Sequence, residues 1–281
     1  ENFAGTFDGQ GHTISGICSY GFVYVVRDGQ TKFCQSGLFT GTQASCVIKD
    51  LRLVNSFFYS DFNEGVGSIS SHGGGTFDSI YSSATIVTYK MNAGGIVGLL
   101  DARGSHTVTN CWFDGTITVK GNVGRYVGGI VGQIEQTNGT CKIEHCLNTG
   151  TLTSPLKNTG VNMGGILGVL MPSGRVQIKD SLTVGSVSNE YGVAVGSVIG
   201  NLAERSATTI SDVYTIRDIY KAVVGYMSSV PVGFPIDYSE QMLTGYGAYQ
   251  WTTLDFDNYW SAVEGGTPVL KHFTKEALTL A

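Results

Sequence analysis

The sequence predicts an all-β protein, a right-handed parallel β-helix of about seven coils with a small C-terminal cap. The first observation is an internal repeat. Residues 128–153 (GGIVGQIEQTNGTCKIEHCLNTGTLT) have similar stretches 34 residues upstream, at 94–119, and 36 residues downstream, at 164–188. A period of this length is typical of solenoids. The second observation is the pattern inside each unit, which favours strands over helices.

Each unit contains about three short strands. A short apolar run between glycines comes first, such as Ile130-Val131 or Ile166-Leu167, and is too short for a helix. A polar loop leads to a segment of alternating apolar and polar residues, which is the pattern of a half-buried strand. A turn glycine such as Gly150 then precedes another alternating strand. Ile96, Ile130 and Ile166 should therefore stack in one interior column.

Composition agrees with this fold and excludes several others. The chain has 281 residues, of which 42% are hydrophobic and 14% charged, so it can bury a large core. Its 40 glycines follow no three-residue pattern, which excludes collagen. The net charge of -5 argues against a nucleic-acid partner. No apolar run approaches the roughly 20 residues of a membrane span, so we expect no membrane insertion.

The N-terminal part contains the opening rungs and an inserted hairpin. Residues 3–17 predict the first strands, and residues 20–34 predict a hairpin whose Asp28-Gly29 pair suits a type I′ turn. The hairpin carries the candidate ligand-binding residues, chosen because exposed Tyr and Arg dominate recognition surfaces and stack on sugar rings: Tyr20, Phe22, Tyr24 and Arg27. The alternative, which we favour, is that the hairpin folds back over the N-terminal end of the stack.

A column of polar residues recurs once in each later unit: Asp50, Asp78, Asn110, His145, Asp180 and Asp212. Such a column could line a metal or sugar groove. We favour a corner of the coil, because Asn and Asp satisfy backbone groups at turns and tolerate unusual dihedral angles. If Asn110 is a corner, Cys111 points inward and Trp112 can be exposed. The next column, Trp112, Leu147, Leu182 and Tyr214, is mostly apolar and is predicted to be buried.

The repeat fades towards the C-terminus. We assign residues 1–225 to the β-helix and residues 226–281 to a capping segment of the same domain. A short helix is expected over residues 238–243, with Ser239 as its N-cap. Four large apolar residues are expected to cover the open end of the stack: Trp251, Phe256, Tyr259 and Trp260.

The six cysteines show no zinc-binding spacing. Cys111 and Cys146 occupy the same place in successive units. We favour stacked thiols over a disulfide, because equivalent side chains in a parallel ladder point the same way. A disulfide between Cys18 and Cys34 is a further alternative.

The candidate catalytic and metal-binding groups each have a structural role as the alternative. Asp255 and Asp257 could form a glycosidase pair, and loop carboxylates on adjacent coils could converge in a groove: Asp101, Asp114, Glu135 and Glu144. We favour a place in the capping segment, without a cleft partner, for Asp255 and Asp257, and solvated surface charge for the loop carboxylates. The five histidines lack metal-ligand spacing, so we expect no metal and no cofactor. No nucleophile elbow occurs.

The repeat resembles a known bacterial family. GGIVG followed by V-x-N-C-W-x-x-G-x-I resembles the GLUG repeat, and FAGTFDGQGHTISGI looks like the segment that opens such regions. YSEQMLTGYGAYQW and LDFDNYWSAVEGGTPVLK are similar to the closing segment. This resemblance implies a parallel β-helix in large secreted or wall-attached bacterial proteins, including adhesin-like proteins and regions flanking immunoglobulin proteases. It implies no catalysis by the repeat itself.

We therefore expect a non-catalytic structural and adhesion module of a larger extracellular bacterial protein, secreted or attached to the cell wall. Its expected partners are a host glycan or glycoprotein and other domains of the same polypeptide. The alternative is a carbohydrate-active enzyme, either a glycoside hydrolase or a polysaccharide lyase, because parallel β-helices also carry such activities. Three or more carboxylates, or Arg and Lys, in a groove across adjacent coils would favour the enzyme.

Overall fold

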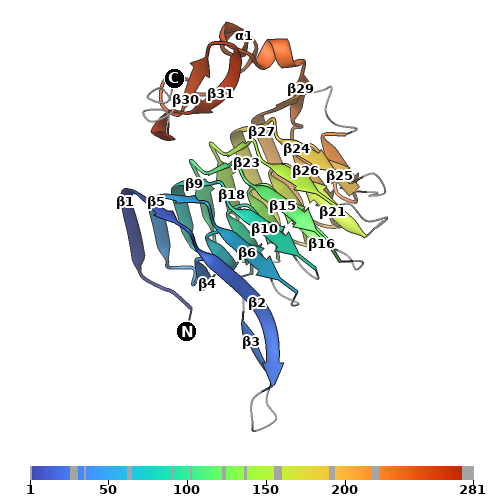
Figure 1. Cartoon of the computed structure of the whole chain (residues 1–281). Coiled ribbons are helices and arrows are strands. Elements are labelled where there is room, and N and C mark those ends of the chain that lie inside the picture. The colour runs from blue at the N-terminus through green and yellow to red at the C-terminus, as the bar shows by residue number, and fades with distance from the viewer. Residues whose placement is uncertain are drawn as a thin grey trace.

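The chain is a parallel β-helix, as predicted, in which successive coils stack along one axis (Figure 1). This computed structural model describes residues 2–25, 31–34, 36–61, 65–89, 92–101, 103–121, 125–135, 138–154, 160–189, 194–216 and 222–273. Four parallel sheets form the walls of the stack, and a two-stranded antiparallel sheet belongs to the C-terminal segment.

Sheet 1 is the longest wall and bends at its middle. Its strands are β1 (Thr6–Ser15), β5 (Val47–Val54), β9 (Thr76–Ser82), β13 (Thr107–Thr109), β14 (Trp112–Phe113), β18 (Cys141–Glu144), β19 (Leu147–Asn148), β23 (Arg175–Thr183), β27 (Ala207–Ile216) and β29 (Ile236–Tyr238). Sheet 2 contains β2 (Cys18–Val25), β3 (Thr31–Cys34), β6 (Phe57–Ser60), β10 (Thr85–Thr88), β15 (Thr116–Val119), β20 (Thr151–Thr153) and β24 (Ser186–Ser188).

Sheets 3 and 4 complete the coil. Sheet 3 contains β7 (Val66–Gly67), β11 (Ala93–Gly94), β16 (Arg125–Gly128), β21 (Val161–Gly164) and β25 (Ala194–Gly196). Sheet 4 contains β4 (Phe39–Gly41), β8 (Ser70–Gly73), β12 (Val97–Leu100), β17 (Val131–Ile134), β22 (Leu167–Leu170), β26 (Ile199–Leu202) and β28 (Val224–Met227). In the described chain, five coils contribute a strand to all four sheets, and an incomplete coil lies at each end. The predicted number of about seven is reached only if these two incomplete coils are counted with the five complete ones.

The predicted interior column is present. The Ile96 amide donates to the Ile130 carbonyl at 3.1 Å, and the Ile130 amide donates to the Ile166 carbonyl at 3.1 Å, so the three residues lie in neighbouring rungs. All three side chains are buried. Apolar columns of this kind fill the interior along every coil, and their burial contributes about 25 cal/mol per Å² of apolar surface. Thr116, in contrast, faces outward between Thr85 and Thr151.

One strand in each coil was not predicted from the sequence, the sheet 3 strand that ends at a single glycine: Gly67, Gly94, Gly128, Gly164 or Gly196. Sheets 3 and 4 meet there in a tight elbow, with almost no side chain between the two backbones. A Cβ on Gly128 would lie 1.9 Å from the carbonyl oxygen of Val131, and a Cβ on Gly132 would lie 2.5 Å from the carbonyl oxygen of Gly98 in the preceding coil. The glycines therefore allow the elbow, and the sheet 3 strands have too little pattern of their own to be predicted.

The predicted hairpin forms, but it does not fold back over the N-terminal end. Residues 18–21 of β2 pair in parallel with β6, and residues 22–25 pair antiparallel with β3. Because β2 continues in the direction of sheet 2, the hairpin extends away from the stack (Figure 1). The proposed turn at Asp28-Gly29 lies outside the described residues.

The C-terminal segment (residues 236–273) leaves the last coil through β29 and then returns along the side of the stack, over sheet 1 (Figure 1). It contains two 3₁₀-helices, η2 (Glu240–Leu243) and η3 (Lys271–Phe273), the helix α1 (Tyr246–Trp251), and the hairpin of β30 (Trp260–Val263) and β31 (Gly266–Leu270). The short helix near residue 240 was predicted, although the Ser239 side chain makes no capping hydrogen bond. The expectation that aromatic residues cover the open end is wrong, because Trp260 is buried against the side of sheet 1 and Trp251 is 55% exposed.

Candidate functional site

The polar column forms the bend of sheet 1. Five of its six predicted members have left-handed backbone angles, with φ between 45° and 59°: Asp50, Asn110, His145, Asp180 and Asp212. In the second complete coil, the corner is Ser79 (φ 55°) and not Asp78, so the predicted column was wrong by one residue there. Asn, Asp and Ser suit such turns because their short polar side chains bond locally to the backbone. The column is a corner, as favoured above.

The corner turns the next column outward, where the C-terminal segment covers it. Leu147, Leu182 and Tyr214 are buried in a cluster with Leu243, Leu254, Trp260, Leu270 and Phe273, and Trp112 packs against the same cluster. Cys111 points into the core, as expected for a corner at Asn110. The predicted burial is therefore confirmed for Leu147, Leu182 and Tyr214, whereas Trp112 is partly buried, and the burial comes from a segment that is distant in sequence.

Asp180 joins the C-terminal segment to this corner. Its Oδ2 accepts hydrogen bonds from Trp260 Nε1 at 2.7 Å and from His145 Nδ1 at 2.6 Å, and its Oδ1 accepts one from the Asp255 amide at 2.8 Å. The His145 ring stacks on Tyr259 with the ring centroids 3.6 Å apart. Three donors satisfy this buried carboxylate, as a buried charge requires.

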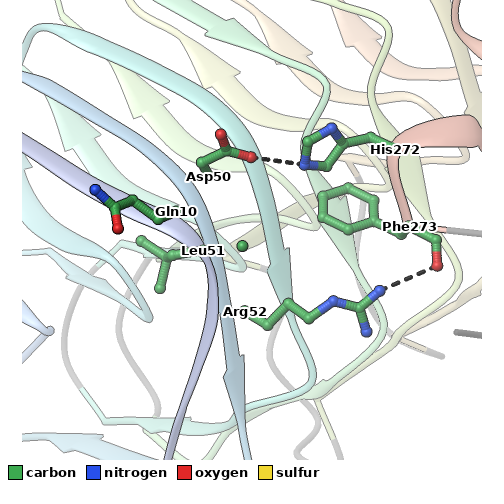
Figure 2. Close-up of a pocket in the computed structure, with 7 residues that line it drawn as sticks. Gln10, Asp50, Leu51, Arg52, His272 and Phe273 are labelled. Carbon is green, nitrogen blue, oxygen red and sulfur yellow. Dashed lines mark hydrogen bonds and ion pairs between the residues drawn. The ribbon is translucent and has the colours of Figure 1, made fainter. Parts of the chain in front are cut away.

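A pocket of about 300 Å³ lies where the end of the C-terminal segment meets the first complete coil (Figure 2). It is lined by Gln10, Gly11, Asp50, Leu51, Arg52, His272 and Phe273. His272 Nε2 lies 2.8 Å from Asp50 Oδ1, and Arg52 Nη2 donates to the Phe273 carbonyl at 3.0 Å, as Figure 2 shows. The pocket therefore combines a carboxylate, a guanidinium and an imidazole.

Aromatic contacts hold Arg52 in place. Its Cζ lies 5.4 Å from the ring centroids of both Tyr81 and Phe273, within the range of a cation–π interaction. Burial raises the pKa of Tyr81 to about 12, with a further contribution from the nearby carboxylate of Asp114. Tyr81 therefore stays neutral at physiological pH and donates to Asp114 Oδ2 at 3.1 Å.

The outer face of sheet 2 is a second candidate site. Its N-terminal half displays a ladder of tyrosines: the ring centroids of Tyr20 and Tyr59 are 5.7 Å apart, and those of Tyr59 and Tyr89 are also 5.7 Å apart. Phe57 packs beside Tyr20 at 5.8 Å. Towards the C-terminal half the same face becomes small and polar, with Thr85, Thr116, Thr118, Thr151, Thr153, Ser186 and Ser188 on its outward columns.

Two of the four predicted ligand-binding residues lie on this face. Tyr20 is 55% exposed and Phe22 is 46% exposed, both on the outward side of β2. Tyr24 belongs to β2, but its side chain lies outside the described part of the structure, as does Arg27 altogether. Sequence reasoning missed Tyr59 and Tyr89, which come from the next two coils. The repeat could have indicated Tyr59, which pairs in register with Tyr20, but not Tyr89, because Val87 holds that column in the next coil and Tyr89 lies two residues beyond it.

The loop carboxylates that could have formed a catalytic groove lie at three different places on the coil, and of these four only Asp101 and Glu135 are neighbours. Asp101 and Glu135 follow sheet 4 in successive coils, Asp114 lies at the turn into sheet 2, and Glu144 is in β18 of sheet 1. Asp255 accepts hydrogen bonds from the Asn258 side chain and amide, and the side-chain bond lowers the pKa of Asp255. Within the described ranges, no three His, Cys, Asp or Glu side chains are grouped so that they could hold a metal ion.

The cysteines are free thiols where they are described. Cys111 and Cys146 are buried in neighbouring coils as stacked thiols, and burial raises the pKa of Cys111 well above its usual value. Cys18 is free and exposed, so it forms no disulfide with Cys34. The two cysteines are too far apart. Cys34 pairs with Phe22, and Phe22 lies four residues, or about 13 Å, along β2 from Cys18.

Comparison with known proteins confirms the fold. The chain is similar to the crystal structure of a candidate immunoglobulin A1 protease from Bacteroides ovatus, with a TM-score of 0.66 and 20% identity, covering 95% of this chain and 77% of that chain. It is 32% identical over 122 residues to halomucin of Haloquadratum walsbyi, which is 42% of this chain and 1% of that protein. The chain thus spans about 1% of the length of this relative. No family model matches the sequence. In the described part of the chain, no helix has the length and apolarity needed to cross a membrane.

Proposed function

We propose that the chain is a non-catalytic structural and binding module of a larger extracellular protein. Its stack of coils, built from repeats of the GLUG type, holds neighbouring domains apart. The outer face of sheet 2 binds a host glycan or glycoprotein. The tyrosine ladder of Tyr20, Tyr59 and Tyr89 is the observation that carries this proposal.

The ladder has the properties of a glycan platform. Tyrosine offers an apolar ring face for stacking and a hydroxyl for hydrogen bonds, and its few rotatable bonds make ordering inexpensive. Tyr20 and Tyr59 occupy the same column on paired strands, so the backbone ladder fixes their relative position before any ligand binds. A pre-organised row of rings at 5.7 Å intervals suits an extended chain of sugar rings better than a compact ligand.

Two similarities support the extracellular setting. One is to a protein named halomucin, of which the matched region is only 1%, as expected if this chain is a module of a very long protein. The other is the fold likeness to a candidate immunoglobulin A1 protease. Neither similarity carries an activity to this chain, and the dispersed carboxylates described above favour binding over hydrolysis.

The test is a glycan array probed with the wild-type chain and with Tyr20→Ala and Tyr59→Ala, alongside hydrolysis assays on the same glycans. Tyr226→Ala is the matched control, because Tyr226 is 54% exposed on β28 at the other end of the stack. Each stacking ring contributes about 1 kcal/mol, so we expect each ladder variant to lose about fivefold in affinity, with the control unchanged. Turnover of a bound glycan, or equal binding by all variants, would refute the proposal.

A further inference from the structure

The pocket between the first complete coil and the end of the C-terminal segment shares no residue with the tyrosine ladder. Asp50 and Arg52 come from β5, and His272 and Phe273 come from η3, more than 200 residues later. Two segments so distant in sequence create the pocket only when the C-terminal segment lies along the stack. We propose that this pocket binds a small neutral polyol, namely a single sugar residue.

The polar groups of the pocket match a pair of neighbouring hydroxyls. A carboxylate only accepts hydrogen bonds, a guanidinium only donates them, and a hydroxyl does both. Among the described residues, Asp50 uses Oδ1 for His272, which leaves Oδ2 to accept from a ligand hydroxyl. The Arg52 guanidinium, two positions along the strand, is the complementary donor for an adjacent ligand oxygen.

Charge and size argue for a neutral and small ligand. The lining carries one carboxylate and one guanidinium, so an anionic ligand would meet Asp50 and a cationic ligand would meet Arg52. The volume of about 300 Å³ is at the lower end of the range for small-molecule sites. An extended glycan would not fit, but one terminal residue or one free monosaccharide would.

The lining is held in position before binding. Arg52 lies against the rings of Tyr81 and Phe273 and donates to the Phe273 carbonyl, while Asp50 is fixed by its corner backbone. Rigid groups lower the entropic cost of ordering a site. Among the residues that the structure describes, the lining includes no Ser, Thr or Cys and no second carboxylate, which favours binding without turnover.

The test is titration of the full chain with a panel of free neutral monosaccharides, followed by ligand-observed NMR and calorimetry. Acetate and inorganic phosphate serve as charged probes. We expect saturable binding of at least one monosaccharide and weaker binding of both anions. Asp50→Asn keeps a residue that tolerates the corner backbone, and Arg52→Lys keeps the charge but loses the planar fork. Each change should weaken binding about tenfold.

Glu204→Gln is the matched control, because this carboxylate is 67% exposed on a turn distant from the pocket. Circular dichroism and melting temperature confirm that the variants fold. The proposal is overturned if the wild type binds no monosaccharide, if both pocket variants bind like the control, or if phosphate binds best.

A further arm separates this site from the tyrosine ladder. Tyr20→Ala should leave monosaccharide binding unchanged, so a loss in that variant would place the sugar on sheet 2 and overturn the pocket. Competition by an oligosaccharide that ends in the same residue would identify a glycan end as the source of the ligand. Its failure to compete would identify the free sugar, and both results support the pocket.

Discussion

Asp180 shows how one residue serves both the corner of a coil and the docking of a distant segment. Its left-handed backbone turns sheet 1, and its carboxylate accepts hydrogen bonds from Trp260, His145 and the Asp255 amide. The position is predictable from the repeat because Asp and Asn recur there. The partners are not, since Trp260 lies 80 residues away and nothing in its local sequence indicates where it packs.

We predict that Asp180→Asn destabilises the protein by about 2 kcal/mol. Asn tolerates the corner backbone, but its amide group places a donor against Trp260 Nε1 or the Asp255 amide, and buried donors without acceptors cost about 1–3 kcal/mol each. Urea unfolding followed by tryptophan fluorescence measures the change. Asp257→Asn, on the exposed side of the same segment, is the control and should match the wild type. Equal stability of the two variants would show that Asp180 does not fasten the segment.

At the scale of elements, local patterns were enough to predict most of the coil. Alternation gave the strands of sheets 1 and 2, and the apolar run between glycines gave sheet 4. The corner residue was predicted correctly in every coil except that of Ser79. There Asp78 was predicted as the corner in place of Ser79, because both residues are small and polar. Sheet 3 was missed, because strands as short as Ala93–Gly94 have no alternation to detect.

The glycines of the elbow between sheets 3 and 4 are required by close backbone contact. We predict that Gly132→Ala prevents correct folding or lowers stability by more than about 3 kcal/mol, because its Cβ would lie 2.5 Å from the Gly98 carbonyl oxygen and 2.7 Å from that of Ala93. Backbone on both sides leaves no flexible atom to move.

The control for this change is Gly5→Ala, where the nearest atom is a Phe3 side-chain carbon at 3.4 Å. Thermal melts of the two variants, followed by circular dichroism, provide the comparison. Similar melting temperatures would mean that the elbow can open, contrary to the close packing of sheets 3 and 4.

At the scale of the whole molecule, the stack was predictable and the course of the C-terminal segment was not. Each repeat cannot bury its apolar face alone, so stacking follows from the repeat itself. The C-terminal aromatic residues indicated that this segment covers something, and the sequence alone suggested the open end. The segment packs against the side of the stack because the outward column there is apolar: Leu147, Leu182 and Tyr214. The position of the segment could be predicted only if the outward turn of that column at the corner were already known.

The repeat allows a test in which one coil is removed. Deletion of residues 129–164 joins Gly128 to Gly165, and because Gly128 pairs with Gly164 in register, every remaining strand meets an equivalent partner. We expect a folded protein with β-type circular dichroism and a cooperative melt. Deletion of residues 129–167 also removes the next elbow and should not fold.

The same deletion tests how the pocket is formed. The C-terminal segment starts at β29, paired with β27 in the last coil, and reaches back to Asp50 in β5. Removing one coil shortens the distance from the last coil to Asp50 by about 4.8 Å, so His272 would lie one rung beyond Asp50. We therefore expect the variant to fold but to lose monosaccharide binding. Retained binding would mean that pairing with the last coil does not set the position of the C-terminal segment along the stack. An unfolded protein would instead contradict the equivalence of the coils on which the stacked architecture depends.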